Sequence, residues 1–549
     1  MKRTISICLS GIGILLITAL TVPGERYFEI AKSLDIFTSL YKEVNANYVD
    51  QVDPNRLITT GINSMLNSLD PYTDYIPEED LESYNIMFTG QYAGIGALIG
   101  TVNKKPVVTH PYPGFPAHRA GLKVGDQLMV IDGLSTEGKT TSEVSAMLKG
   151  QPQTQIELVV KRAGQDQLLK FTMQRETIKV SNVVYHGMVD KETGYIKLDD
   201  FTTGAGREVR QALESLKKQG ARSVILDLRD NPGGILQEAV NIVNLFIPKG
   251  KEVVATKGKV QDWNKSYYTL NVPIDTDIPM AVLTSGGSAS AAEIVAGALQ
   301  DYDRAVLVGQ RTFGKGLVQT TRQLGSFNAH LKVTTARYYI PSGRCIQALD
   351  YSHRKSDGTV ERFADSVRSA FKTIRGRTVY DGGGLEPDIK VGQQEVGSLL
   401  EQLFESGLVF EYASLYVATH SFPTTLSSWH LSDQDYQSFI DWTRTQSFVY
   451  TSEIEAEAKK LEEAIEQEGY RSELEHSLTL VKSKIAQDRS TEFERFKSQI
   501  VLGLEEEIAF HHSLNAGQVE VSSGRDPEIL AARKILADQD AYRKLLAVH

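Results

Sequence analysis

The 549-residue sequence has only two cysteines and no recognisable metal-binding pattern. Cys8 lies in an apolar N-terminal stretch, and if that stretch is removed Cys345 is left alone, which excludes a structural disulfide. None of the 11 histidines has metal-ligand spacing. His511 and His512 are adjacent and so cannot share a helix face, and we expect both to be exposed. The sequence therefore predicts neither a disulfide framework nor a metal site.

The sequence also has fewer basic than acidic residues. Lysine and arginine number 59 against 69 aspartates and glutamates, which gives a net charge of −10. This balance argues against nucleic acid as a partner. The length is sufficient for three to four domains, each with its own core.

The apolar run Ile5 to Leu20 is shorter than the stretch of about 20 residues that a membrane span needs. Lys2 and Arg3 precede it, as the charged region of a secretory signal precedes its apolar region. No Ala-x-Ala precedes Glu25, so residues 1–24 are interpreted as either a signal peptide or an uncleaved N-terminal anchor. Both predict an exported protein, periplasmic or attached to the outer face of the cytoplasmic membrane. The alternative is a buried N-terminal helix of a cytosolic protein.

Residues 25–88 have a helical pattern. Ile36, Leu40, Val44 and Tyr48 recur at four-residue spacing, and a second amphipathic stretch runs from Leu57 to Leu69. No chemistry is evident in this region, and we expect the apolar stripe to pack.

Residues 89–176 read as a compact β-rich module. A glycine loop, Gly94-Ile95-Gly96, precedes the run Ala120-Gly121-Leu122-Lys123-x-Gly125-Asp126. A capping box at Thr140 to Glu143 and alternating strands around residues 156–158 and 168–170 follow. This arrangement resembles a PDZ domain.

The PDZ resemblance implies that Gly94, Ile95 and Gly96 present backbone N–H groups to the terminal carboxylate of a peptide, which adds as a strand beside them. The alternative is a module that only packs against its neighbours. Gly114-Phe115-Pro116-Ala117 stands where Ser-Pro-Ala is common, which leaves the tail preference open.

Residues 177–390 alternate strands and helices. The strand predicted at Ser223 to Arg229 leads into Asp230-Asn231-Pro232-Gly233-Gly234 and a helix, and Met280 to Leu283 leads through a second glycine turn to Ser290. Two such units in succession indicate a layered α/β domain. The Gly233-Gly234 turn allows close backbone approach to a ligand.

Ser290 is expected in the first turn of the helix after the second turn, where free N–H groups and the helix dipole suit an oxyanion. Lys315 follows in Thr312-Phe313-Gly314-Lys315-Gly316, and a neutral lysine amine can accept a hydroxyl proton. That role needs the lysine pKa lowered by about 3 units, which burial can supply. Ser288 is a rival hydroxyl. Taken singly, the serine also suits a helix cap and the lysine a surface loop.

Five motifs occur in the order found in carboxyl-terminal processing proteases, also called tail-specific proteases, and the sequence resembles that family from about residue 30 to 390. They are Asp227-Leu228-Arg229-Asp230-Asn231-Pro232-Gly233-Gly234, Ser288-Ala289-Ser290-Ala291-Ala292-Glu293-Ile294, Thr312-Phe313-Gly314-Lys315-Gly316, Tyr338-Tyr339-Ile340-Pro341-Ser342-Gly343-Arg344 and Gly382-Gly383-Gly384-Leu385-Glu386-Pro387-Asp388.

The family resemblance implies that Ser290 is the nucleophile, Lys315 the general base and Gln319 the residue that positions the lysine. The backbone N–H of Ala291 and that of Gly233 or Gly234 would form the oxyanion hole. No metal or organic cofactor is implied. The implied fold is α+β and multidomain: an α/β crotonase-like protease core with an inserted PDZ domain and helical N- and C-terminal regions.

Residues 391–549 form an extension that the motifs do not explain. Ile454, Ala458, Leu461 and Ile465, and again Leu474, Leu478, Val481 and Ile485, step by four, three and four. This spacing suits either a coiled coil, for a homo-oligomer or an adaptor, or a helical domain packed on the protease. A further helix is predicted from Asp526 to Leu546, and the polar stretch Tyr351 to Arg375 is predicted to be a surface loop.

The sequence thus predicts an exported serine endopeptidase that recognises the C-terminal tails of proteins or peptides. The N-terminal segment allows membrane anchoring. The alternative is a non-catalytic PDZ adaptor or peptide-binding scaffold. A crotonase-like acyl-CoA enzyme is a third possibility, but it does not account for the PDZ signature, and enolate chemistry does not require a serine–lysine pair.

Overall fold

The computed structural model describes residues 27–547 except 326, 356–357, 393–396, 447, 449 and 490. The predicted signal peptide or anchor over residues 1–24 lies outside the described residues. The chain divides into two compact units, one reaching to Glu78 and including Gln319–Thr334, the other formed by Glu79–Val318 and the chain from Thr335 onward. Among the described helices, none is both long and apolar enough to span a bilayer.

The first unit begins with a helix over residues 27–47 and continues with α2 (Pro54–Asn67). The Asp53 carboxylate caps α2 by accepting the N–H groups of the next turn. β1 (Asp74–Ile76) pairs antiparallel with the first residues of β18 (His330–Tyr339). β17 (Leu317–Gln323) also pairs with β18.

The predicted packing of the first apolar stripe is wrong for several of its residues. Ile36 is 58% exposed and Leu40 59% exposed. The neighbouring residue Phe37 packs against α2 instead. Its ring lies 3.6 Å from the point that a methyl group on Gly61 would occupy. Of the stripe, Val44 is half-buried, and Ile36, Leu40 and Tyr48 remain on the surface of this chain.

The core of the second unit is a six-stranded sheet, in which β11 to β23 run parallel and β10 is an antiparallel edge strand. All residues of the three central strands β12, β15 and β16 are buried, as expected for parallel strands covered on both faces. In spatial order the strands are β10 (Val183–Met188), β11 (Thr193–Leu198), β12 (Ser223–Asp227), β15 (Met280–Thr284), β16 (Val306–Gly309) and β23 (Ile389–Lys390).

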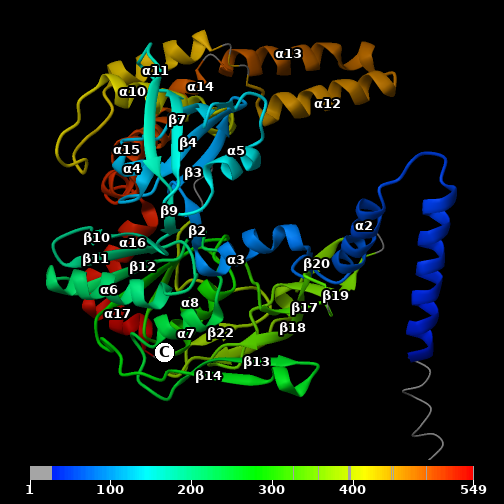
Figure 1. The fold of residues 1–549 in the computed structure, drawn as a ribbon. Helices are drawn as coiled ribbons and strands as arrows, with labels where there is room; N and C mark the ends of the chain where they lie inside the picture. Colours follow the sequence, from blue (N-terminus) through cyan, green and yellow to red (C-terminus); the bar gives the residue numbers. More distant parts are fainter. Residues whose placement is uncertain are drawn as a thin grey trace, which may run out of the picture. The chain divides into compact units, whose positions relative to one another are not determined.

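Helices from distant parts of the chain cover the two faces of this sheet (Figure 1). One face packs against α6 (Ala205–Lys218), α7 (Leu236–Val243) and α8 (Ala291–Asp301). The other packs against α16 (Pro527–Ala537) and α17 (Gln539–Leu546). The last two helices of the C-terminal extension therefore pack on the core, whereas the described residues of the two stretches with the 4-3-4 spacing do not take part in this layer. The single helix predicted from Asp526 to Leu546 is two helices, because Asp538 leaves the helical conformation and caps α17.

The predicted β-rich module is also present. Its sheet has the order β3-β4-β5-β7-β8, with the short β6 paired to β5, and a separate ribbon joins β2 to β9. The predicted capping box at Thr140 begins α5. The elements are α3 (Leu81–Thr89), β2 (Gln91–Gly94), β3 (Ala97–Val102), β4 (Lys105–Pro111), α4 (Pro116–Arg119), β5 (Gln127–Ile131), β6 (Leu134–Ser135), α5 (Thr141–Leu148), β7 (Gln155–Lys161), β8 (Leu169–Gln174) and β9 (Glu176–Lys179).

The C-terminal region is helical, as predicted. The two periodic stretches form α12 and α13, which contact each other across a turn at Gly469. The module and the helices are linked by the amide of Asn103, which donates to Glu411 Oε1 at 2.8 Å. The helices are α9 (Ser398–Glu405), α10 (Leu408–Thr419), α11 (Asp433–Thr445), α12 (Glu453–Gln467), α13 (Arg471–Arg489), α14 (Glu492–Arg495) and α15 (Lys497–Ser522).

The polar stretch predicted as a surface loop contains two short antiparallel ladders. The chain pairs with itself across turns at Gly358 and Gly376, both of which have positive φ. The remaining elements are β13 (Glu252–Gly258), β14 (Lys265–Tyr268), β19 (Leu349–Arg354), β20 (Val360–Arg362), β21 (Ala370–Lys372), β22 (Thr378–Tyr380) and the 3₁₀ turns Glu78–Asp80, Gln261–Trp263 and Asp365–Val367.

Candidate active site

Ser290 occupies a strained turn between a buried strand and a buried helix. The sequence analysis placed Ser290 within the first turn of the helix, but in the structure it stands immediately before α8. Its φ of 55° and ψ of −115° are rare for a residue other than glycine. A serine on a sharp, strained strand-to-helix turn is typical of a nucleophile elbow, which exposes the hydroxyl.

The neighbouring hydroxyl of Ser288 is used in the structure of the turn. Its Oγ donates to the carbonyl of Leu228 at 2.7 Å and accepts the N–H of Ser285 at 2.9 Å. The residue is 1% exposed. The single proton of the Ser288 hydroxyl is donated to a backbone carbonyl. Ser288 therefore links the serine turn to the residue that follows β12.

The glycine loop after β12 lies against the serine turn. The N–H of Ala289 donates to the carbonyl of Asn231 at 2.9 Å. A methyl group on Gly233 would lie 2.7 Å from Ala291 N and 2.8 Å from Ser290 Cβ. One on Gly234 would instead lie 2.7 Å from the carbonyl oxygen of Phe201. Of the two predicted glycines, Gly233 is therefore the one beside Ser290.

The backbone N–H of Gly233 has an acceptor within its own loop. It donates to Asn231 Oδ1 at 2.8 Å, and the Asn231 amide in turn donates to the carbonyl of Leu198 at 2.6 Å. Asn231 thus holds the glycine loop to the end of β11.

The loop carrying Lys315 is held by close backbone packing. A methyl group on Gly314 would lie 2.4 Å from the side chain of Ala348, and one on Gly316 would lie 2.8 Å from Gln347 N. The Lys315 carbonyl accepts the hydroxyl of Tyr338. Lys315 is half-buried, which is less burial than the predicted apolar environment implied.

Gln319 falls in the first unit, within β17. Its amide donates to the hydroxyl of Thr334 at 3.2 Å. That hydroxyl lies on β18, within the same unit.

A buried carboxylate connects the serine turn to the lysine loop, and sequence reasoning assigned it no role. Glu293 is 0% exposed and accepts the N–H groups of Ser290, Gly314 and Lys315, each at 2.9 Å. It also accepts the hydroxyl of Thr312 at 2.5 Å. Burial raises its pKa from 4.5 to about 7, although all four donors favour the ionised form. The available signal was an acid three residues after a helix-capping serine.

Comparisons with known proteins place this chain in a family. The family model "Peptidase family S41" matches residues 192–351, "PDZ domain" matches 107–162, and "Probable PDZ-protease, C-terminal helical domain" matches 399–536. A carboxy-terminal-processing protease of Bartonella bacilliformis is 35% identical over 339 residues, which cover 61% of this chain and 77% of that protein. The chain belongs to the carboxy-terminal processing protease family. It is accordingly a serine protease that carries a PDZ domain.

Other similar proteins have the same description. The carboxy-terminal processing protease CtpA of Bacillus subtilis is 33% identical over 368 residues, which cover 66% of this chain and 76% of that protein. The solved photosystem II D1 C-terminal processing protease is 26% identical, covers 65% of this chain and 92% of its own, and has a TM-score of 0.34.

The predicted tail-binding loop of the PDZ domain has a fixed shape. Ile95 is 1% exposed in the domain core, and its carbonyl accepts the N–H of Ala117 at 2.8 Å. The carbonyl of Gly96 accepts the N–H of Tyr112 at 2.9 Å. Gly96 has a φ of 75°, and a methyl group there would lie 2.4 Å from Phe115 Cβ, so only glycine fits. Gly94 ends β2 just before this turn.

The prediction that both adjacent histidines are exposed is wrong for His511, which is 6% exposed. Its Nδ1 lies 3.2 Å from Ser414 Oγ and its Nε2 3.1 Å from Glu507 Oε1. Both ring nitrogens therefore have protein partners, and this pairing accounts for the burial. Within the described part of the chain, no group of three or more histidine, cysteine, aspartate or glutamate side chains could hold a metal ion.

We predict that Glu293→Gln lowers kcat by on the order of 100-fold with little change in KM, because the amide group can no longer accept all four donors and Ser290 shifts relative to Lys315. The free energy of unfolding should also change its pH dependence. Folding raises the pKa of Glu293, so the folded chain binds the proton more tightly and its stability falls as the pH rises from 4.5 to about 7. Urea unfolding across that pH range would measure this effect. In the variant, the free energy of unfolding should not show the decrease that the titration of Glu293 causes in the parent.

Glu214→Gln is the matched control, since Glu214 is exposed on α6. It should retain both the activity and the pH dependence of stability. Unchanged kcat in Glu293→Gln, or an unchanged pH dependence, would contradict the role given to Glu293.

Proposed function

We propose that this chain is an exported serine endopeptidase that recognises the C-terminal tails of protein substrates through its PDZ domain and cleaves peptide bonds with Ser290 and Lys315. The observation that carries the proposal is the strained turn at Ser290, tied by the buried carboxylate of Glu293 to the backbone of Lys315. A merely structural helix cap has no need of this strain, which costs about 1–3 kcal/mol.

In the proposed reaction the neutral amine of Lys315 accepts the Ser290 proton as Oγ attacks the peptide carbonyl. The lysine then donates that proton to the leaving amine, and the acyl group remains on Ser290. Water, deprotonated by the same lysine, hydrolyses this ester and restores the serine. The family resemblance gives Gln319 the role of positioning the lysine amine. No step requires a metal or an organic cofactor.

The oxyanion that forms during attack is assigned to the backbone N–H groups of Ala291 and Gly233. Ala291 is the first residue of α8, where N–H groups have no acceptor within the helix. We choose Gly233 over Gly234 because it lies beside Ser290 and Ala291. Its N–H must leave Asn231 Oδ1 to serve the oxyanion. Each such donor contributes about 3–4 kcal/mol in related acyl-transfer sites.

The proposal extends to domain organisation and location. We infer a crotonase-like core over residues 177–390, supported by the parallel sheet and its two strand, glycine turn and helix units, with the PDZ domain over residues 89–176. The helical regions would occupy residues 25–88 and 391–549. Export, with the protein periplasmic or anchored to the outer face of the cytoplasmic membrane, rests on the sequence of residues 1–24. We also propose that the C-terminal helices mediate homo-oligomer formation or adaptor binding. The exposed hydrophobic residues of α12 and α13 support this proposal.

Tail recognition is tested with two unfolded substrates of identical sequence, one ending in a free carboxylate and the other in an amide. We expect kcat/KM for the amide to be lower by about tenfold or more, because the PDZ loop loses its charged ligand. Cleavage is followed by mass spectrometry in the presence of a chelator, with Ser290→Ala protein as the blank. Equal rates for the two substrates would remove tail recognition from the proposal, whereas tail binding without cleavage would favour the adaptor alternative.

A further inference from the structure

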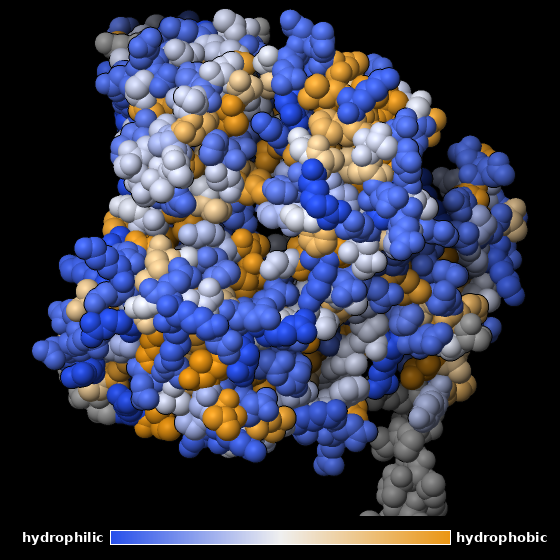
Figure 2. Space-filling model, turned by 60° about the vertical axis from the view of Figure 1, so that its left-hand side comes forward, coloured by the Kyte–Doolittle hydropathy of each residue, from blue (hydrophilic) through white to orange (hydrophobic). Residues whose placement is uncertain are grey.

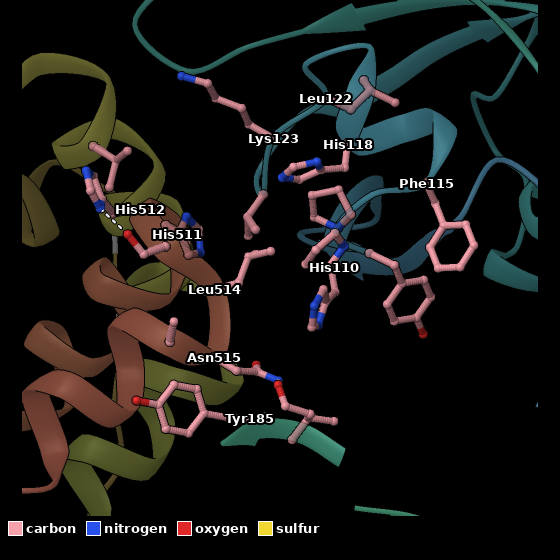
Figure 3. A pocket seen from close by; sticks show the side chains of 18 of the residues that line it. His110, Phe115, His118, Leu122, Lys123, Tyr185, His511, His512, Leu514 and Asn515 are labelled. Atoms are coloured by element: carbon pink, nitrogen blue, oxygen red, sulfur yellow. Dashed lines mark hydrogen bonds between the residues drawn. The ribbon is translucent and has the colours of Figure 1, made fainter. Parts of the chain in front are cut away.

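A pocket of about 910 Å³ opens where the PDZ domain, the edge strand of the core sheet and the C-terminal helices meet (Figure 3). Its lining residues come from four segments, 110–124, 179–185, 417–422 and 511–516. The tail-binding loop at residues 94–96 contributes none of them, although Gly96 contacts the lining residues Tyr112 and Phe115. A pocket of this size suits a small-molecule ligand.

The polar groups that line the pocket are basic. Among the described residues that line it there is no aspartate or glutamate, although acidic residues outnumber basic ones in the whole chain. The basic side chains are Lys123, Lys179, His110, His118, His420, His511 and His512. Carboxylates behind the lining serve three of them: Glu208 lies 3.6 Å from Lys179, Asp435 3.8 Å from His420 and Glu507 3.1 Å from His511.

Lys123 of the PDZ domain and His512 of α15 both line the pocket, and the Lys123 side chain extends outward, away from His110 and Leu514 (Figure 3). Burial and then the charge of Lys123 lower the pKa of His512, whereas the charge of Glu520 acts to raise it. An anion placed beside them would stabilise the Lys123 ammonium and would favour protonation of the His512 imidazole. This rim of the pocket therefore favours a negatively charged group.

The interior is apolar and includes a strained backbone. Leu122, Val124, Val183, Phe422 and Leu514 contribute hydrophobic surface. The helix α15 is interrupted at Ser513 and Leu514, where Leu514 has a φ of 55° and a ψ of −148°. The Leu514 side chain points into the pocket (Figure 3). Figure 2 shows a mostly hydrophilic face with hydrophobic side chains gathered in patches. Apolar side chains sheltered in a pocket can remove the hydrocarbon part of a ligand from water.

The adjacent strand is a poor template for a peptide. β10 is the edge of its sheet, but its register shifts between Val183 and Tyr185. The carbonyl of Val184 accepts the side-chain amide of Asn515 at 3.5 Å. A bulged and capped edge resists the addition of another strand. A ligand without peptide groups fits the pocket better, because it brings no backbone donors or acceptors that need partners.

We propose that this pocket binds a single-chain carboxylate amphiphile of the fatty-acid class, with its hydrocarbon chain against Leu514 and the other apolar residues and its carboxylate beside Lys123 and His512. The binding is non-covalent and independent of the proposed peptide hydrolysis. Its test can therefore use Ser290→Ala protein, and its failure would leave the proposed function unaffected.

The test measures the binding of myristate and of uncharged tetradecanol to the full chain by isothermal titration calorimetry. Myristate should bind, and tetradecanol should bind at least about tenfold more weakly, because it lacks the charged head group. Lys123→Glu should weaken myristate binding by about tenfold or more. Lys105→Glu is the matched control, an exposed lysine of the same PDZ domain outside the pocket, and it should bind myristate as the parent does.

A photoreactive diazirine analogue of myristate provides a second measurement that needs no variant. Cross-links should map to residues 110–124, 179–185, 417–422 or 511–516. Four outcomes would overturn the proposal: no myristate binding, equal binding of tetradecanol, equal binding by Lys123→Glu, or cross-links confined to other segments. Displacement of the analogue by an acetylated apolar peptide, with no displacement by myristate, would likewise overturn the choice of ligand.

Discussion

Replacing Ser290 with alanine should lower kcat for peptide hydrolysis by on the order of 10⁴ to 10⁶, because the acyl group then has no oxygen to which it can transfer. Substrate binding should be nearly unchanged, since the hydroxyl makes its decisive interaction only during attack. Single-turnover kinetics on an unfolded substrate with a free C-terminus, together with a separate binding assay on the same substrate, would measure both quantities.

Ser288→Ala is the matched control two residues away. The Ser288 hydroxyl contacts Leu228 and Ser285, so its loss should cost about 1–3 kcal/mol of stability by leaving these backbone groups unpaired. Below its melting temperature the variant should keep most of its activity. If Ser288→Ala abolished cleavage while Ser290→Ala retained it, the nucleophile would have been assigned to the wrong serine.

Replacing Lys315 with methionine should lower kcat by on the order of 10² to 10⁴, which is the range that general acid–base catalysis contributes. Lys315→Arg should be equally inactive, because a guanidinium stays protonated and cannot accept the Ser290 proton. The Ser290→Ala, Lys315→Met double variant should be no slower than Ser290→Ala alone, since the two residues act as one unit. Steady-state kinetics on the tail-bearing substrate would compare the three proteins.

Lys265→Met is the control for this series, because Lys265 is exposed on β14. It should behave as the parent protein. Substantial activity in Lys315→Arg would mean that the site needs a positive charge rather than a base, and the proposed mechanism would then be wrong.

The local elements around the site could be predicted from the sequence. The strand, glycine turn and helix around residues 223–243 and 280–301 follow from apolar runs that end in glycines, and the structure contains them. The sequence could not reveal the strained φ of Ser290, since the same residues also suit an ordinary capped helix. That distinction depends on the close approach of Gly233 from another loop.

Contacts between distant segments were the main features missed. Glu293 receives donors from Thr312, Gly314 and Lys315, which are close to it only after α8 and β16 have folded. The burial of His511 depends on Ser414 in another helix. In each case the periodicity described the element correctly, but the partner is set by tertiary packing that one sequence does not show.

The C-terminal helices give the clearest example at the scale of a layer. The sequence left open a coiled coil or a helical domain packed on the protease, and it did not show that α16 and α17 cover the second face of the core sheet. Tyr542 in α17 accepts the N–H of Met280 in β15 at 3.0 Å. A strand buried on both faces predicts two covering layers, but it does not say which part of the chain supplies the second.

The central claim is that Ser290 is a nucleophile activated by Lys315. Its most direct test is peptide mapping by mass spectrometry after the protein reacts with a fluorophosphonate, which labels activated serines. The account predicts one adduct on Ser290, formed at least about 100-fold more slowly in Lys315→Met. An adduct on Ser288, or labelling of Ser290 at the same rate in Lys315→Met, would contradict it.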